Sequence, residues 1–540
     1  MKNVDLIAQT LEAAGVKWVF GVPSGPVLPL IDALERTSVR YVLTASETSA
    51  GFMASAVGSL TGTPGVCLST LGPGATNMST GVGCAWLDCA PLVAITCNVP
   101  TPWLERRIQM RIDHHALFAP ITKASLPLRH TDVAARVTEA LAIATAEPPG
   151  PVHLDLPEDV GAAEAPADAA AVPNGATVET AAADASAAVA AGNAVAAVAD
   201  ALAASRRPVV MTGLGFTRTR AADALQAFVE RQGIPFISTM HGKGWLPESH
   251  PNWAGVLGRA RRTNVQRFIN GADLVIAVGY DPIEINYEEW AGSIPVVHVA
   301  NQAADVDGSV DVRFNEATYM DEALRGIAGL APAANDWSVE EWAVHRAQLD
   351  ADLRPETATM SAHRVLDNLR EKLPADGILV YDVGAHTHQI ATQWRTDLPN
   401  TCVSTNGWSS MGYGIPGAIA AKLAHPDRRV VGVVGDGCFQ MTAGELAVMR
   451  RLDLPLPIVV LNDGWLALIK LKQQGKSYGV GGSFLGEPPP TPPEYFGVPT
   501  RTVHDEAGLG EALDWGMSLD GPSVIEAYID PDSYARTVYD

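Results

Sequence analysis

Acidic residues directly follow two apolar runs in the last third of the chain. One run, residues 430–434, ends at Asp436 between two glycines, and the other, residues 458–461, ends at Asn462 and Asp463. Hard oxygen ligands of this kind suit Mg²⁺, and a glycine turn offers backbone N–H groups to an anion. These residues could therefore hold a magnesium ion that carries a diphosphate group.

The chain between the two runs has the pattern of a helix. Thr442 and Glu445 form a possible capping box, which predicts a helix from there through Leu452. A strand–helix–strand unit makes its two strands parallel and places their carboxyl ends on the same side. We therefore expect Asp436 and Asp463 to lie close together at the ligand-binding edge of a sheet. Two ordinary strand–turn junctions of another α/β fold would have the same pattern.

The GDG…ND pattern resembles the cofactor signature of thiamine-diphosphate-dependent enzymes, including the spacing between Asp436 and Asp463. The resemblance implies that these carboxylates bind Mg²⁺ with the help of the backbone carbonyl of Trp465. It also implies four cofactor-binding positions in this stretch, Gly435, Gly437, Cys438 and Asn462. The sequence departs from the family at Cys438, where serine is common, and at Trp465 and Leu466.

The resemblance implies further cofactor contacts upstream of this stretch. In relatives a Gly-x-His sequence approaches the diphosphate, which makes three residues candidates here, Gly384, Ala385 and His386. Residues 407–414 resemble the GxxMG segment of the family, in which a large apolar side chain supports the bent cofactor. Met411 corresponds to that side chain, although an isolated Met normally fills a core. The carbonyl of Ser409 would accept a hydrogen bond from the amino group of the cofactor.

A carboxylate also follows a strand in the first part of the chain. Residues 41–44 are strand-like, and Glu47 precedes a helix of small residues over 48–60. An acid at a helix start is most often a solvated side chain that the helix dipole favours. The resemblance places a glutamate at such a point, where it hydrogen-bonds the aminopyrimidine ring of the cofactor. That chemistry requires a carboxyl group in a dry pocket.

Two adjacent histidines, His114 and His115, have two interpretations. Isolated histidines are usually surface residues or satisfied core residues. The pair resembles the His-His pair of the pyruvate-decarboxylase branch, where imidazole binds the substrate or moves a proton. The flanking sequence ALFAPITKAS resembles the synthase branch, which lacks this pair. Both interpretations stay open.

The composition and charge restrict the class of protein. The chain has 540 residues, of which 47% are hydrophobic, and a formal net charge of −22. These values predict a soluble globular protein of about three domains and argue against binding to nucleic acid or an anionic membrane. An amphipathic N-terminus, the lack of a membrane-length apolar run and six cysteines without a CxxC pair predict a cytoplasmic protein.

Alternating helical and strand-like patterns predict an α/β protein with three doubly wound parallel-sheet domains. We expect a first domain at residues 1–160, an Ala-rich linker at 161–190 and a middle domain at 191–330. A second linker at 331–360 leads to a last domain at 361–540. By the resemblance, the first domain is the pyrimidine-binding domain and the last is the diphosphate-binding domain.

The middle domain resembles that of acetolactate-synthase-like proteins in the phrase ADLVIAVGYDPIEINYEEW. Some relatives carry FAD in this domain, and in them an Arg-Phe-Asp-Asp run usually follows the glycine. The run at that place, Tyr280-Asp281-Pro282-Ile283-Glu284, resembles the flavin-free branch. We therefore expect a structural middle domain without FAD.

The resemblance implies decarboxylation of a 2-oxo acid, and single positions bear on the fate of the decarboxylated fragment. The pyruvate-decarboxylase branch has a proton-transferring glutamate where this chain has Ile469, and flavin-dependent acetolactate synthases have a Trp where it has Lys472. Lys470 and Lys472 are either solvated helix residues or contacts to an anionic substrate. We expect an acetolactate-synthase-like carboligase, which joins the fragment to a second carbonyl compound to form an acyloin.

Two alternatives stay open. One is a simple 2-oxo acid decarboxylase that uses His114 and His115 and releases an aldehyde. The other is a non-catalytic cofactor-binding homologue, against which the intact Glu47 argues. In this family the site lies between the first domain of one subunit and the last domain of another. A homodimer or homotetramer with a shared active site is therefore expected.

Overall fold

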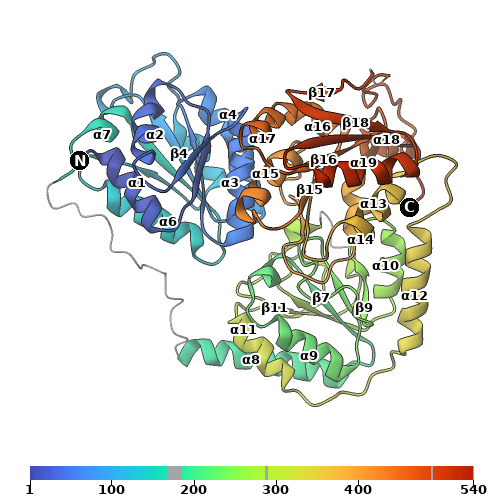
Figure 1. Cartoon of the computed structure of the whole chain (residues 1–540). Coiled ribbons are helices and arrows are strands. Elements are labelled where there is room, and N and C mark those ends of the chain that lie inside the picture. The colour runs from blue at the N-terminus through green and yellow to red at the C-terminus, as the bar shows by residue number, and fades with distance from the viewer. Residues whose placement is uncertain (167–184, 286–289, 488–489, 539–540) are drawn as a thin grey trace.

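Three sheets, each flanked by helices, organise the protein (Figure 1). This computed structural model describes residues 1–166, 185–285, 290–487 and 490–538. Nearly all strand pairs in the three sheets are parallel, which confirms the predicted α/β class with three mostly parallel sheets.

The first domain has a six-stranded parallel sheet in the order β2-β1-β3-β4-β6-β5. Its strands are β1 (Trp18–Gly21), β2 (Arg40–Leu43), β3 (Gly65–Ser69), β4 (Leu92–Asn98), β5 (Ala124–Pro127) and β6 (Pro151–Pro157). Its helices are α1 (Asn3–Ala13), α2 (Leu28–Leu34), α3 (Glu47–Thr61), α4 (Pro73–Leu87), α5 (His114–Phe118), α6 (Val133–Thr145) and α7 (Glu158–Ala162). Strands β3, β4 and β6 are buried along their whole length, as expected for a parallel sheet covered on both faces.

The middle domain has a six-stranded sheet in the order β12-β11-β10-β7-β8-β9, so the strand order reverses between β7 and β10. Its strands are β7 (Pro208–Thr212), β8 (Phe236–Ser238), β9 (Trp253–Val256), β10 (Leu274–Val278), β11 (Val296–Val299) and β12 (Val312–Phe314). Its helices are α8 (Ala185–Ala204), α9 (Ala222–Gln232), α10 (Arg262–Ile269), α11 (Met320–Ala328) and α12 (Val339–Asp352).

The last domain has a seven-stranded sheet in the order β14-β13-β15-β16-β19-β18-β17, in which only β17 and β18 pair antiparallel among the described residues. Its strands are β13 (Ile378–Tyr381), β14 (Cys402–Val403), β15 (Val430–Gly435), β16 (Pro457–Asn462), β17 (Glu494–Tyr495), β18 (Val498–Val503) and β19 (Ser523–Tyr528). Its helices are α13 (Ala362–Lys372), α14 (Ala385–Gln393), α15 (Gly414–Ala424), α16 (Asp436–Thr442), α17 (Leu446–Arg451), α18 (Ala467–Gly475) and α19 (Glu506–Ser518).

The helix predicted to open at Thr442 is preceded by a separate helix. Helix α16 starts at Asp436 directly after β15, and a short 3₁₀ turn, η7 (Ala443–Glu445), separates it from α17. The side chain of Thr442 makes no capping hydrogen bond. The predicted helical stretch is present, because η7 has Thr442 as its N-cap and α17 ends at Arg451. Only the capping box was wrong, since the hydroxyl of Thr442 donates to the carbonyl of Cys438 at 3.5 Å and the carboxylate of Glu445 accepts from the N–H of Ala45.

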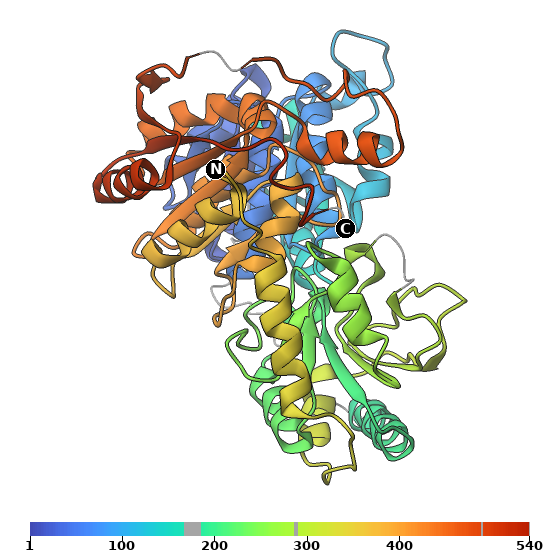
Figure 2. The same cartoon turned by 90° about the vertical axis from the view of Figure 1, so that its right-hand side faces the viewer.

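Helix α12 lies within residues 331–360, a segment whose composition suggested a linker. Its Trp342 and Leu349 are buried in the core of the middle domain. Figure 2 shows the helix running from the middle domain toward the last one, where Arg395 donates to Asp350 at 2.7 Å. The linker expected at residues 161–190 falls mainly outside the described residues. The domain boundaries stay predictions.

Helix α8 contains a segment, Ser186–Ala204, that is long and apolar enough to cross a membrane by length and composition, with a mean hydropathy of 1.6. The expectation that no apolar run reaches this length was therefore wrong. Ala194, Val198 and Leu202 follow one another at four-residue spacing and are buried in the core of the middle domain. That spacing is typical of one helix face that packs on a protein core.

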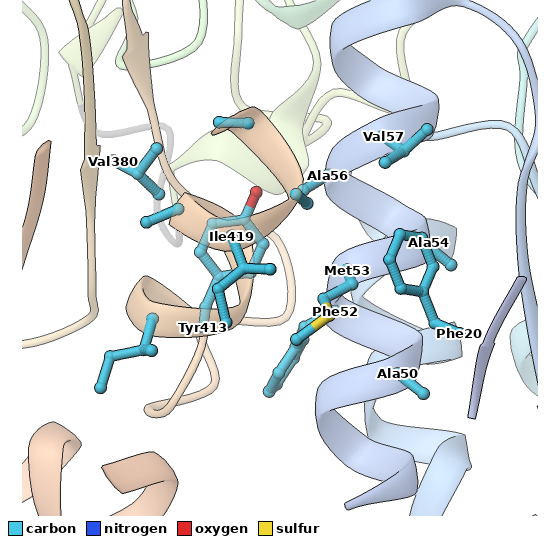
Figure 3. Close-up of a cluster of buried hydrophobic side chains, with 14 of the residues drawn as sticks. Phe20, Ala50, Phe52, Met53, Ala54, Ala56, Val57, Val380, Tyr413 and Ile419 are labelled. Carbon is cyan, nitrogen blue, oxygen red and sulfur yellow. The ribbon is translucent and has the colours of Figure 1, made fainter. Parts of the chain in front are cut away.

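Helix α3 of the first domain packs against α15 of the last domain in one continuous hydrophobic core. Figure 3 shows Phe52 on α3 opposite Tyr413 and Ile419, and the rings of Phe52 and Tyr413 meet edge to face with centroids 5.8 Å apart. On its other side α3 lies very close to α4, since a Cβ atom at Gly51 would be 2.8 Å from the Cα of Gly81. These contacts fix the first domain against the last.

We expect Phe52→Ala to destabilise the protein by about 3 to 5 kcal/mol, because it leaves a cavity in the core shared by the two domains. Denaturant unfolding of the full chain measures this loss. Leu28→Ala is the control, because Leu28 lies in the same domain and is 54% exposed. An equally small effect of both substitutions would contradict the importance of this core.

Candidate active site

Three strand ends meet at one edge of the sheet of the last domain. Strands β13, β15 and β16 are adjacent and parallel, so the residues after their carboxyl ends lie together. Asp436 accepts hydrogen bonds at 2.7 Å from the N–H of Gly437 through Oδ1 and at 2.7 Å from the N–H of Gly464 through Oδ2. Its carboxylate therefore joins the turn after β15 to the turn after β16.

Asp463 lies in the turn after β16 and accepts from the N–H of Trp465 at 2.8 Å. Loss of solvation and repulsion from Asp436 raise the pKa of Asp463 to about 8. Loss of solvation raises the pKa of Asp436 to about 6. Two crowded carboxyl groups with raised pKa values are stabilised by a cation, and their oxygens are the ligands that Mg²⁺ prefers. These residues fit a magnesium site, to which the carbonyl of Trp465 could contribute.

The candidate diphosphate residues lie beside these carboxylates. The ring of His386 fills the space next to two glycines, since Cβ atoms at Gly384 and Gly435 would lie 2.9 and 3.2 Å from its Cε1. Burial lowers the pKa of His386 to about 4, and its Nε2 has no hydrogen-bond partner among the residues that the structure describes. Ala385 begins α14, whose N-terminus offers N–H groups to an anion. Cys438 donates to the carbonyl of Val383 at 3.1 Å.

Met411 lies next to the metal-binding turn. A Cβ atom at Gly437 would be 3.2 Å from the Cε of Met411, so a side chain at Gly437 would collide with it. Ser409 adopts a positive φ of 50° in the same loop. The carboxylate of Asp382, which the sequence analysis did not single out, holds this loop by accepting from the N–H of Gly412 at 2.9 Å. Asp382 is buried at the end of β13. Its place directly after a strand-like run was the sequence signal that could have identified it.

A cavity of about 380 Å³ opens beside these residues, with Asp436 and Asn462 in its lining. The Nδ2 of Asn462 donates to Glu526 at 2.7 Å, while its Oδ1 is buried without a partner. Tyr495 also lines the cavity. Glu526 is a second residue that sequence reasoning missed, because it belongs to β19, far from both motifs in the chain.

Glu47 begins helix α3, and Ser46 caps the helix by accepting from Ser49. Glu47 accepts from Asn77 of α4 at 3.1 Å and lies against the first turn of α4, 3.3 Å from the Cβ position of Gly74. Within the described part of the chain, no hydrogen bond or ion pair joins Glu47 to the carboxylates at the edge of the last domain. The candidate catalytic residue Glu47 and the candidate metal-binding pair thus lie in two separate half-sites.

Glu445 of the last domain supports the segment just before Glu47. Its Oε1 accepts from the N–H of Ala45 at 3.0 Å. Burial raises the pKa of Glu445 to about 7. The sequence analysis assigned Glu445 to a capping box, whereas the structure places its carboxylate against the start of α3.

The two predicted histidines have different surroundings. His114 is buried, its Nδ1 lies 2.9 Å from Asp155, and its Nε2 accepts from the N–H of Gly72 at 3.2 Å. His115 has a side chain that is 39% exposed and hydrogen-bonds Ser125 at 2.6 Å. Both nitrogens of His114 are thus occupied by its own domain. It supports the turn at Gly72 that precedes α4 and is not free to contact a substrate.

Sequence reasoning missed the partners of His114. Thr96 Oγ1 lies 2.9 Å from His114 and 2.8 Å from His153, and His153 has its pKa lowered to about 3 by burial. His153 and Asp155 alternate along β6, which places both on one face of the sheet. That alternation was the sequence signal that could have indicated that the two side chains lie together.

The two lysines after the metal-binding turn also differ. Lys470 is buried, forms an ion pair with Asp532 at 2.8 Å and lies 4.6 Å from the ring centroid of Trp465. Lys472 is exposed. Ile469 is 42% exposed. Lys470 is therefore committed to its own domain, so the interpretation as an anionic-substrate contact remains open only for Lys472.

Family models match all three domains in order. Residues 1–117 match the N-terminal TPP binding domain of thiamine pyrophosphate enzymes, residues 195–327 match the central domain, and residues 382–527 match the C-terminal TPP binding domain. Thiamine pyrophosphate is another name for thiamine diphosphate. The matched segments together cover more than half of the chain.

Full-length relatives are also similar. A probable acetolactate synthase large subunit of Methanocaldococcus jannaschii is 30% identical over 98% of this chain and 92% of its own length. The acetolactate synthase isozyme 1 large subunit of Escherichia coli K12 is 30% identical over 98% and 94%. The acetolactate synthase of Bacillus subtilis 168 is 28% identical over 98% and 93%. With its three matched domains and these relatives, the chain belongs to the thiamine-diphosphate-dependent enzymes, in the acetolactate-synthase-like group.

Proposed function

We propose that this chain decarboxylates a 2-oxo acid with thiamine diphosphate and joins the remaining fragment to a second carbonyl compound, forming an acyloin. The observation that carries the proposal is the pairing of Asp436 with Asp463 beside His386 at one sheet edge. Two hard anionic ligands next to a helix N-terminus suit a metal-bound diphosphate. Relatives named acetolactate synthase support the carboligation step.

The residues of this chain have separate roles in the proposal. Asp436 and Asp463 hold Mg²⁺ with the carbonyl of Trp465, and the N-terminus of α14 receives the diphosphate. Bound thiamine diphosphate would supply a nucleophilic carbon that takes up the electron pair left by decarboxylation. Glu47 holds the proton that its carboxyl oxygen exchanges with the aminopyrimidine ring, and Asn77 orients that carboxyl group.

Two observations favour ligation over simple release of an aldehyde. His114 has both nitrogens hydrogen-bonded inside the first domain, so it cannot serve as a free acid at the substrate. Ile469 has no proton to transfer. Because neither His114 nor Ile469 can protonate the decarboxylated fragment, attack on a second carbonyl compound competes more effectively.

The two half-sites support a homodimer in which each site combines two chains. Glu47 contacts Asn77 of its own domain, while the metal-binding pair lies at the edge of the last domain. Large apolar side chains are exposed near both half-sites, including Met110 beside the Gly72 turn and Met441 on α16. Exposed apolar side chains of this size suit an interface. A homodimer is the minimum assembly in this proposal, and a homotetramer is compatible with it. The proposal places the protein in the cytoplasm.

The proposed reaction predicts the product. The full-length protein, incubated with pyruvate, thiamine diphosphate and Mg²⁺, should release carbon dioxide and form an acyloin-type acid from two pyruvate molecules, detected by mass spectrometry. The control is the same incubation without thiamine diphosphate. Acetaldehyde as the sole product, for pyruvate and for a panel of larger 2-oxo acids, would refute ligation.

We expect Glu47→Gln to lower kcat at least about 100-fold, because the amide cannot exchange the proton. Thiamine diphosphate binding, measured by calorimetry in the presence of Mg²⁺, should change much less than kcat. Glu35→Gln, at an exposed residue of the same domain, is the control. Unchanged turnover in Glu47→Gln would remove this residue from the mechanism.

A further inference from the structure

The middle domain has a crevice at the point where its strand order reverses. Strand β7 is followed in sequence by β8 and β9 on one side, whereas β10, β11 and β12 extend on the other. In open α/β sheets, ligands bind outside the carboxyl ends of the strands at such a point. Here those ends lead into the turn Gly213-Leu214-Gly215 after β7 and to Gly279 after β10.

Backbone N–H groups of that turn are the groups that would receive a phosphate, and all four of them are occupied. Gly213 donates to the carbonyl of Val278 at 3.0 Å and Gly215 to that of Gly279 at 2.7 Å. Phe216 donates back to the carbonyl of Gly213 at 3.0 Å. The remaining group, the N–H of Leu214, donates at 2.8 Å to the carboxylate of Glu284.

Glu284 occupies the crevice as an anion would. It ends the 3₁₀ turn η5 (Pro282–Glu284) and is 3% exposed. Its Oε2 is 2.7 Å from the Cβ position of Gly213, so any side chain at Gly213 would collide with it. Its Oε1 accepts a short hydrogen bond from Thr239 and lies 3.4 Å from Nδ1 of His241. A hydroxyl, a backbone N–H and an imidazole surround this carboxylate.

The backbone of Glu284 also contacts the last domain. Its carbonyl accepts from Nδ2 of Asn406 at 3.0 Å and from Arg259 at 3.3 Å, and Arg259 hydrogen-bonds the side-chain oxygen of Asn406 as well. Asp88 of the first domain accepts from the N–H of Asn406 at 3.2 Å and of Gly407 at 2.7 Å. All three domains thus meet at Asn406.

Asn406 stands at the start of the loop that carries Ser409 and Met411. Beyond Asn406 the loop packs on α4, since a Cβ atom at Gly83 would lie 2.7 Å from the ring of Trp408. A displacement of Glu284 would therefore move the first anchor of this loop. The carboxylate that fills the crevice and the carbonyl that anchors the loop therefore belong to the same residue, Glu284.

We propose that the carboxylate of Glu284 takes the place of a ligand anion in the nucleotide-type crevice of the middle domain. Through Glu284 the crevice then holds residues 405–411 in position. Among the described residues, the backbone N–H groups of the turn at 213–216 consequently have no vacancy for the phosphate of a nucleotide. Glu284 acts through Asn406 and is a positioning residue, since it does not touch the metal-binding turn. The proposal predicts that the protein binds neither FAD nor ADP.

The test removes the carboxylate of Glu284 by substitution and then supplies a free carboxylate, formate, in solution. In the full-length Glu284→Ala protein, two buried donors lose their acceptor, so we expect Tm to fall by about 4 °C or more. The Kd of thiamine diphosphate should rise several-fold, because the loop loses its anchor. Sodium formate should restore at least half of both losses in this variant in a saturable manner. Sodium chloride at equal ionic strength should restore neither the Tm nor the Kd.

Three controls make the result specific. The wild-type protein and the exposed-site variant Glu316→Ala should not respond to formate. Thr239→Val removes one donor but keeps the anion, and it should also lack a response. Glu284→Gln, which keeps the side-chain shape, should fold and lose less stability than Glu284→Ala. It replaces Glu284→Ala as the binding test if the alanine variant is insoluble.

Nucleotide binding decides the proposal independently of any variant. Calorimetry with ADP and gel filtration after incubation with FAD should detect no binding to the wild-type protein. Stoichiometric binding of either nucleotide would overturn the proposal. So would an unchanged Tm in Glu284→Ala, a loss in that variant that formate does not restore, or an unchanged Kd of thiamine diphosphate in the variant that folds. Each of these readouts is independent of the reaction product.

Discussion

Asp436 and Asp463 are held close together by two neighbouring parallel strands, and Asp436 raises the pKa of Asp463 by repulsion. The backbone fixes this arrangement, because Asp436 is hydrogen-bonded to the turns on both sides. Such a pair is stabilised when a cation neutralises it. The features around it suit the anion that such a cation would carry, since α14 begins beside the pair and the Nε2 of His386 has no hydrogen-bond partner among the described residues.

This edge of the last domain is only half of the proposed site, so the arrangement of the domains matters as much as the local chemistry. The hydrophobic core between α3 and α15 sets the position of Glu47 relative to its own last domain. Asp88 and Glu284 attach the loop that begins at Asn406 to the other two domains. Small shifts between domains would therefore reach Ser409 and Met411. The middle domain, in this account, contributes to the site through position and not through a second cofactor.

The sequence predicted the parts of the site that depend on local order along the chain. The closeness of Asp436 and Asp463 follows from the strand–helix–strand unit between them, because such a unit makes its strands parallel and places their carboxyl ends on the same side. The helical stretch after Thr442 is present, but the capping box there was wrong, because the side chains of Thr442 and Glu445 have other partners, the carbonyl of Cys438 and the N–H of Ala45. The burial of His114 depends on Thr96 and Asp155, which are distant in sequence, and the contacts of Glu284 cross domain boundaries. Neither could be predicted without the three-dimensional packing.

The central claim is that each active site combines Glu47 of one chain with the metal-binding pair of another. Co-expression of two differently tagged, individually inactive chains, Glu47→Gln and Asp463→Ala, tests it most directly, with activity measured on the purified mixed dimers. One of the two sites in each mixed dimer would then contain both wild-type residues, so the mixed dimers should recover about half of the wild-type activity per dimer. Mixed dimers as inactive as their parents would contradict the account, because a site formed within one chain always contains a substitution.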